Sequence, residues 1–409
     1  MTVISTTSPV APSNVAPAPS KYAFATLAIH AGQEPDPHTG AVIPALSLST
    51  TYKQSAVGVH QGFEYSRSGN PNRADFETAI AALEKANYAL AFASGSATTA
   101  TLVNMLPGGS HIVSVNDVYG GTYRYFTKVA PNSNVKATFV DLFDPTNLRN
   151  AMQDNTRMVW LETPTNPTLR LVDVRAIADI AHEFGAILVV DNTFLSPYFQ
   201  NPLELGADIV VHSCTKYING HSDVVLGVAA MRDAQIYDKL KFLQNSIGAI
   251  PAPFDCFMAH RGLKTLHLRM RQHETNALAV AEALEAASGL VENVIYPGLP
   301  SHPQYELAQR QQSGFGGMVT FRIRGDLATA DRFLQNVKLF TLAESLGGVE
   351  SLCELPAIMT HGAVSAEDRA VLGITDNLIR LSVGVEDTQD LVQDVLQALQ
   401  AAVEANPSA

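Results

Sequence analysis

The 409-residue sequence has little of several features that would point to other classes of protein. Its three cysteines, Cys214, Cys256 and Cys353, are too few and too scattered for a disulfide framework or a CxxC metal pair, which fits a reducing compartment. The 27 basic residues are outnumbered by 39 acidic ones, and the net charge of −12 provides no basic stripe for a nucleic acid or an acidic membrane. No apolar run approaches the roughly 20 residues that cross a bilayer. We therefore expect a cytoplasmic protein with no nucleic-acid or membrane partner.

The composition also predicts how the chain is divided. Residues 1–21 are rich in Ser, Thr, Pro and Ala, lack the features of a signal or transit peptide, and are expected to form a disordered tail. Residues 22–71 show little periodicity, and an arm of this length without a core of its own must lie on something else, which suggests an oligomer. The length of the chain predicts a large domain at 72–255 and a smaller domain at 256–409.

From residue 72 onward, apolar strands alternate with helices, as is typical of a mostly parallel sheet with helices on both faces. The smaller domain is expected to be of the α+β type, with half-buried strands at 318–323 and 378–383. The 12 histidines include no HExxH motif and no cluster at ligand spacing, so no metal site is expected. The strands of the large domain are expected near residues 88–93, 111–115, 136–141, 157–162, 186–191, 208–213 and 224–230.

Two strands place a carboxylate and an amine at the same edge of this sheet. The apolar run 186–190 ends at Asp191, and the apolar run 207–211 leads into a turn that carries Lys216. Open α/β sheets bind ligands at the carboxyl ends of their strands. A single lysine is most often a surface residue. An aspartate facing a pyridinium nitrogen and a lysine that bonds to the cofactor, however, are what pyridoxal 5′-phosphate (PLP) requires of a protein.

Other strand ends support this interpretation. Ser94-Gly95-Ser96 precedes a helix of small residues and suggests an anion site, although the glycine could simply ease a turn. Tyr119 follows strand 111–115 and Asn166 follows strand 157–162, where each alone could be an ordinary core or turn residue. Arg380 lies on the polar face of strand 378–383, which suits a grip on a carboxylate, with a surface ion pair as the alternative. Together these residues predict a cofactor site.

Six stretches in one order resemble the Cys/Met-metabolism PLP-dependent enzymes, and the resemblance covers nearly the whole chain after residue 22. It implies a PLP-dependent aspartate-aminotransferase-type fold (fold type I), with a mostly parallel sheet, helices on both faces and a smaller C-terminal α+β domain. It also implies a homotetramer assembled as a dimer of dimers. The stretches are 65–71 (YSRSGNP), 117–121 (DVYGG), 162–167 (ETPTNP), 190–194 (VDNTF), 213–217 (SCTKY) and 342–348 (LAESLGG).

The resemblance further implies a role for each site residue. Lys216 would bond to the cofactor and shuttle protons, and Asp191 would pair with the ring nitrogen. Tyr119 would stack on the ring and handle a proton, and Asn166 would contact the phenolic oxygen. The phosphate would be bound by Gly95, Ser96, Ser213 and Thr215, joined by Tyr65 and Arg67 from a partner subunit. The substrate would be bound by Arg380, Glu344, Asn166, Ser345 and Tyr65. At the position of Ser96 the animal lyases of the family carry an apolar residue.

The activity implied is that of a carbon–sulfur lyase: α,γ-elimination of L-cystathionine to L-cysteine, 2-oxobutanoate and ammonia, a step of trans-sulfuration and cysteine biosynthesis, with hydrogen sulfide from cysteine as a side reaction. Glu344 suits the distal ammonium of cystathionine but is shared with the γ-synthases. Cystathionine γ-synthase or O-acylhomoserine sulfhydrylase chemistry, a γ-replacement, therefore stays an alternative. Residues 65–68 and 242–251 favour the lyase. Intact Lys216, Asp191 and Arg380 weigh against a third possibility, a catalytically inactive binding protein.

Overall fold

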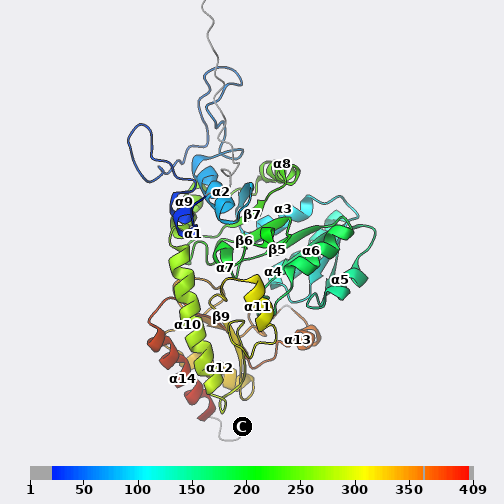
Figure 1. The fold of residues 1–409 in the computed structure, drawn as a ribbon, viewed down its shortest axis with the longest axis vertical. Coiled ribbons are helices and arrows are strands. Elements are labelled where there is room, and N and C mark those ends of the chain that lie inside the picture. The colour runs from blue at the N-terminus through cyan, green and yellow to red at the C-terminus, as the bar shows by residue number, and fades with distance from the viewer. Residues whose placement is uncertain (1–20, 363, 405–409) are drawn as a thin grey trace, which may run out of the picture.

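The computed structural model describes residues 21–362 and 364–404, so the tail predicted at 1–21 lies, apart from Lys21, outside the described residues. Figure 1 shows two halves, each built around a sheet, with the long helix α10 (Leu266–Ala286) running from one half into the other. The first half holds a seven-stranded sheet and the second a five-stranded sheet.

The seven-stranded sheet has the order β1-β7-β6-β5-β4-β2-β3 and confirms the predicted, mostly parallel architecture. Only β7 runs antiparallel to its neighbours, β1 and β6. This strand begins three residues later than predicted because Leu226 bonds through its backbone N–H to Thr215 Oγ1 (3.0 Å) instead of to a strand. The strands are β1 (Tyr88–Phe92), β2 (His111–Val115), β3 (Lys136–Val140), β4 (Thr156–Glu162), β5 (Ile187–Asp191), β6 (Ile209–Ser213) and β7 (Gly227–Met231).

Helices pack around this sheet, and their starts follow local signals. In the first of them, the Asn70 side chain accepts from the Asn72 backbone N–H (3.0 Å), Pro71 occupies the first helical position, and Phe76 and Ile80 are buried. The helices are α2 (Pro71–Leu83), α3 (Gly95–Asn104), α4 (Gly120–Lys128), α5 (Pro145–Ala151), α6 (Val174–Glu183), α7 (Ser196–Phe199), α8 (Ala234–Leu243) and α9 (Pro253–Leu263), with shorter turns at Ala130–Ser133, Pro202–Glu204 and Gln244–Gly248.

The arm that precedes α2 contains one element that the sequence pattern does not reveal, the helix α1 (Phe24–His30). Ala28 is its only buried residue, so α1 has no apolar stripe from which it could be predicted. After α1 the chain extends away from the large sheet (Figure 1). It leaves Val42, Leu48 and Val57 65%, 67% and 102% exposed.

The second half packs one face of its sheet, ordered β10-β11-β12-β9-β8, against helices. Ile379 and Leu381 of β12 lie in that core, as predicted. The expectation of a half-buried strand is wrong, because every residue of β12 is buried: Arg380 and Thr320 on the other face bond to the loop that follows β4. The elements are β8 (Val291–Ile295), β9 (Met318–Ile323), β10 (Thr341–Leu342), β11 (Leu352–Glu354), β12 (Leu378–Ser382), α11 (Tyr305–Gln311), α12 (Leu327–Asn336), α13 (Ala366–Leu372) and α14 (Thr388–Glu404).

Helix α10 contributes to both hydrophobic cores. Met270, near its start, belongs to the core of the large sheet, and Ala277, about two turns later, belongs to the core of the small sheet. The domain boundary near residue 256 stays a prediction. Within the described residues, no helix combines the length and apolarity needed to cross a membrane.

Candidate active site

The strand ends of the large sheet and the loops of the smaller half enclose a cavity of about 330 Å³. Tyr65 and Arg67 do not line it: Tyr65 is 48% exposed, and Arg67 donates from Nη1 to the Asn245 backbone oxygen (2.9 Å). The other predicted site residues all line the cavity: Gly95, Ser96, Tyr119, Asn166, Asp191, Ser213, Thr215, Lys216, Glu344, Ser345 and Arg380.

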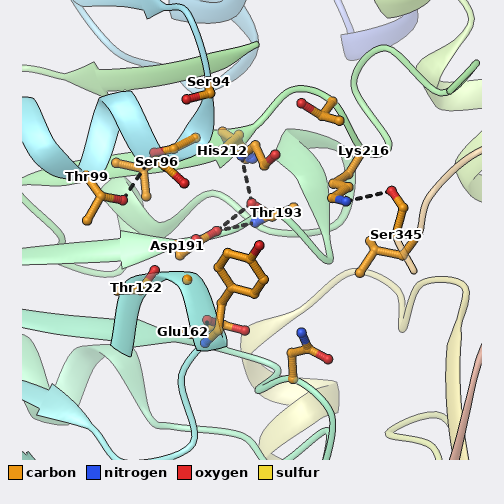
Figure 2. A pocket seen from close by; sticks show the side chains of 18 of the residues that line it. Ser94, Ser96, Thr99, Thr122, Glu162, Asp191, Thr193, His212, Lys216 and Ser345 are labelled. Carbon is orange, nitrogen blue, oxygen red and sulfur yellow. Dashed lines mark hydrogen bonds between the residues drawn. The ribbon is translucent and has the colours of Figure 1, made fainter. Parts of the chain in front are cut away.

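Lys216 lies in the turn that follows β6, and its side chain enters the cavity. Its Nζ donates a hydrogen bond to Ser345 Oγ (2.6 Å), and Figure 2 shows the two side chains pointing toward one another. Burial, followed by the positive charge of Arg380, lowers the pKa of this amine to about 8. A fraction of the Lys216 amines is therefore uncharged near neutral pH and could accept a proton, as a proton shuttle requires.

Asp191 lies at the end of β5, beside Thr193 (Figure 2). Its Oδ1 accepts from the Thr193 backbone N–H (3.0 Å), while burial raises the pKa of the carboxyl. Glu162 is its register partner on β4, and burial, followed by the charge of Asp191, raises the pKa of Glu162 well above its usual range. Two neighbouring, poorly solvated carboxyl groups are costly to ionise unless a positive charge lies close by, and a protonated ring nitrogen would provide that charge.

Tyr119 immediately precedes α4, and its backbone N–H donates to Glu162 Oε2 (2.8 Å). The ring is 45% exposed and borders the cavity. Gly121 is needed for this placement, because a Cβ atom there would lie 2.3 Å from Tyr119 Cε1. The anchored backbone and the close glycine fix one aromatic ring at the cavity wall.

The start of α3 supplies an anion site on the same cavity. Ser94 caps the helix, its Oγ accepting from the Ala97 backbone N–H (3.0 Å), and Gly95 and Ser96 follow at the cavity edge. A Cβ at Gly95 would lie 3.2 Å from Ser213 Cβ, so the lack of a side chain lets the strand end approach closely. Free backbone N–H groups and the positive end of the helix dipole favour a phosphate here.

Arg380 is held on the opposite wall and is only 2% exposed, which excludes the surface ion pair considered above. Its Nη1 donates to Asn166 Oδ1 (2.9 Å) and its Nη2 to the Ser345 backbone oxygen (2.8 Å). Nη1 also forms an ion pair with Glu354 Oε1 (2.9 Å), a buried residue that sequence reasoning missed. Glu344 lies at the cavity edge with an exposed side chain.

Three comparisons with known proteins agree with this geometry. A family model described as "Cys/Met metabolism PLP-dependent enzyme" matches residues 25–400. The chain belongs to this family. It is 60% identical over 382 residues to a cystathionine gamma-lyase of Dictyostelium discoideum, an alignment that covers 93% of this chain and 98% of the relative.

Solved structures of the family have the same fold. The cystathionine gamma-lyase from yeast is 55% identical with a TM-score of 0.91 and covers 95% of this chain and 100% of its own. A cystathionine gamma synthase from Xanthomonas oryzae pv. oryzae is 42% identical with a TM-score of 0.92 and covers 94% of this chain and 100% of its own. The fold therefore does not separate lyase from synthase, whereas the lyases of Dictyostelium discoideum and yeast are more similar to this chain in sequence than this synthase is.

The cavity fits the cofactor on which this family depends. Asp191 is a poorly solvated carboxyl with which a protonated ring nitrogen would pair, Lys216 is an amine with a lowered pKa, and the start of α3 would accept a phosphate. Asn166 uses Oδ1 for Arg380, so its amide nitrogen is the atom left for a cofactor oxygen. These donors match a pyridinium ring, an aldehyde and a phosphate. Within residues 21–362 and 364–404, no group of His, Cys, Asp or Glu could hold a metal ion.

Sequence reasoning missed four groups that support these residues. Thr193 and Thr360 line the cavity, Glu162 anchors Tyr119, and Glu354 pairs with Arg380. Glu162 is the first residue of the family-like stretch ETPTNP, so the sequence pointed to this position but did not indicate what its side chain binds. The strand that carries Glu354 has three residues, too few for a periodic pattern.

Proposed function

We propose that the protein is a carbon–sulfur lyase that cleaves L-cystathionine by PLP-dependent α,γ-elimination, giving L-cysteine, 2-oxobutanoate and ammonia. The observation that carries this proposal is that one cavity joins the amine of Lys216, the fixed guanidinium of Arg380 and the carboxylate of Glu344. There, the α-carboxylate of an α-amino acid has a partner in Arg380, and a second ammonium group at its far end has a partner in Glu344. The 60% identity to a cystathionine gamma-lyase supports the same activity.

Residues from both halves hold the cofactor in this proposal. Asp191 pairs with the ring nitrogen, Tyr119 stacks on the ring, and Asn166 donates to the phenolic oxygen. The phosphate lies on the start of α3, where it is bound by Gly95, Ser96, Ser213 and Thr215. When bound, PLP supplies an electron sink for negative charge at the substrate Cα.

The protein's own groups then bind the substrate and move protons. Arg380 holds the α-carboxylate, which fixes the direction of the Cα–H bond. Lys216 takes the proton from Cα and returns protons during turnover, a role that suits an amine with a pKa of about 8. Tyr119 handles the proton at the substrate amine or at the departing sulfur. Cleavage of the Cγ–S bond releases cysteine, and water then releases 2-oxobutanoate and ammonia.

Glu344 selects the substrate by its charge. Its exposed carboxylate at the cavity edge attracts the distal ammonium of cystathionine, whereas an apolar side chain there would give no such attraction. Ser345, next to it, positions Lys216 through the 2.6 Å hydrogen bond.

A homotetramer built from two dimers completes the site in this proposal. Tyr65 and Arg67 lie outside the cavity of their own chain, and the arm around them exposes apolar side chains such as Val42 and Val57. An arm of this kind fits a surface of a partner subunit, where Tyr65 and Arg67 reach the phosphate of the neighbouring site. The cytoplasm is the proposed location, because the three buried cysteines are free.

A product assay tests this function. Purified PLP-loaded protein is incubated with L-cystathionine, and in parallel with an activated homoserine plus a thiol. We expect 2-oxobutanoate and cysteine from the first mixture, and loss of the products and of the visible cofactor absorbance in Lys216→Ala. Faster thioether formation from homoserine than cleavage of cystathionine would assign the protein to the γ-synthases instead.

A further inference from the structure

Arg380, the residue proposed to bind the substrate carboxylate, already has a carboxylate partner. Glu354 on β11 is its register partner across the antiparallel pair β11 and β12. The ion pair between Glu354 Oε1 and Arg380 Nη1 spans 2.9 Å, and the two side chains are 0% and 2% exposed. The side chain of Arg380 borders the cavity, so this pair lies where the substrate carboxylate has to bind.

Glu354 is not needed to aim Arg380. The Asn166 side chain and the Ser345 backbone oxygen accept from Nη1 and Nη2 at 2.9 and 2.8 Å, which fixes both ends of the guanidinium. The Nε atom of Arg380 is buried and has no hydrogen-bond partner among the described residues. A donor of this kind is available to an incoming carboxylate.

Glu354 is itself poorly satisfied. The Thr360 hydroxyl donates to Oε1 (2.8 Å), but Oε2 is buried without a hydrogen-bond partner in the described part of the chain. Burial raises the pKa of Glu354, and the charge of Arg380 opposes that shift. A carboxylate in this environment depends on the arginine for its charge compensation.

A ligand carboxylate that binds Arg380 would share the positive charge of the arginine with Glu354. The α-carboxylate of any substrate or product brings a negative charge close to Glu354, where little water screens the repulsion. Thr360 also borders the cavity, so Glu354 lies directly behind its wall.

We propose that Glu354 is an internal counter-ion of Arg380 that competes with the α-carboxylate of the ligand. It stabilises the arginine in the empty site and weakens the binding of every α-amino or α-keto acid, which favours release of cysteine and 2-oxobutanoate. The inference rests on the proposed function in one respect, namely that Arg380 binds the carboxylate. Glu354 acts through the charge of Arg380 and is not itself among the residues that line the cavity.

Glu354→Gln tests the proposal, because it removes the charge and keeps an oxygen acceptor for Thr360. In the PLP-loaded enzyme, we expect KM for cystathionine and Kd for glycine, an α-amino acid that has no side chain to eliminate, to fall about tenfold or more, with a smaller change in kcat. Without ligand the variant should unfold at a lower temperature than the wild type, and glycine should raise its Tm by more than it raises that of the wild type.

Two further variants keep the test decisive. Glu350→Gln removes the same charge from an exposed residue four positions earlier and should leave KM and Kd unchanged. Thr360→Val removes the other donor to Glu354, which strengthens its hold on Arg380, so KM and Kd should rise. If Glu354→Gln does not fold, the rise of KM and Kd in Thr360→Val still tests the counter-ion role of Glu354, and unchanged values would contradict it.

The outcomes separate the two proposals. A wild-type enzyme that cleaves cystathionine, combined with unchanged or weaker glycine binding in Glu354→Gln, would overturn the counter-ion role and leave the proposed function intact. A wild-type enzyme that does not cleave cystathionine would refute the proposed function, whereas the glycine measurements would still decide the role of Glu354. Equal losses of glycine binding in Glu354→Gln and Thr360→Val would show that Glu354 only orients the arginine.

Discussion

Gly121→Ala should displace the ring of Tyr119 without changing any group that takes part in the reaction. The added Cβ would lie 2.3 Å from Tyr119 Cε1, and ordinary contact begins at 3.4 Å, so the ring has to move by about 1.1 Å. The Tyr119 backbone cannot follow freely, because its N–H is bound to Glu162.

Two effects set how much catalytic efficiency Gly121→Ala should lose. A lost aromatic stacking interaction costs about 0.5 to 1.5 kcal/mol, and a 1 Å misplacement of a reacting group can reduce the rate by about a hundredfold. We therefore expect kcat/KM for cystathionine to fall by between roughly twofold, if only the weakest stacking is lost, and a hundredfold, if the ring hydroxyl is misplaced. The visible circular dichroism of bound PLP should change with it, because the ring no longer lies against the cofactor.

Gly289→Ala is the matched control, since nothing lies within 4 Å of a Cβ at that position, and it should behave like the wild type. Tyr119→Phe keeps the ring and removes the hydroxyl, so it should retain the dichroism while losing rate. Wild-type dichroism and kcat/KM in Gly121→Ala would refute the inference that Gly121 sets the ring position.

Three further predictions address substrate choice, electrostatics and assembly. Glu344→Ala should lose roughly tenfold to a hundredfold in kcat/KM toward cystathionine and little toward a substrate without a distal amine, and equal losses on both would contradict the selectivity role. The buried Lys216 has a folded pKa of about 8 against 10.5 unfolded, so the unfolded chain binds more protons between these values. Denaturant midpoints of the cofactor-free protein should therefore rise relative to those of Lys216→Met as the pH increases from 8 to 10.5, and a constant difference would show that the amine is not destabilised by burial. Inactive Arg67→Ala and inactive Lys216→Ala should regain part of the activity after subunit exchange, because some hybrid sites carry neither change; exchange without recovery would refute a shared site.

The residues at strand ends could be predicted from the sequence because their position follows from a one-dimensional pattern. Asp191 ends a buried strand, Lys216 and Tyr119 follow buried strands, and parallel strands end at the same edge of the sheet. The order of strands and helices along the sequence was therefore sufficient to predict that these three residues lie around one cavity. The arm residues Tyr65 and Arg67 stay predictions, because their role depends on a partner subunit.

Contacts that depend on register between distant segments could not be predicted. Glu354 meets Arg380 only because β11, three residues long, pairs with β12 in one particular alignment. The burial of both faces of β12 depends on the loop after β4, where Asn166 accepts from Arg380 across 214 residues of the chain. Helix α1 buries a single residue, so nothing in its pattern sets it apart from the rest of the arm.

The turn that carries Lys216 is held rigidly by the first turns of α10. Arg269 donates to the backbone oxygens of Tyr217 (2.6 Å) and Ile218 (3.1 Å), and a Cβ at Gly347 would lie only 2.7 Å from the Tyr217 backbone nitrogen. The backbone of this turn therefore has no room to travel during a catalytic cycle. In the proposed reaction, Lys216 would reach each of its proton acceptors by rotation about its own side-chain bonds, and such motions take picoseconds to nanoseconds. Proton transfer in that reaction would be set by the reach of one side chain from a fixed turn and would need no movement of this turn.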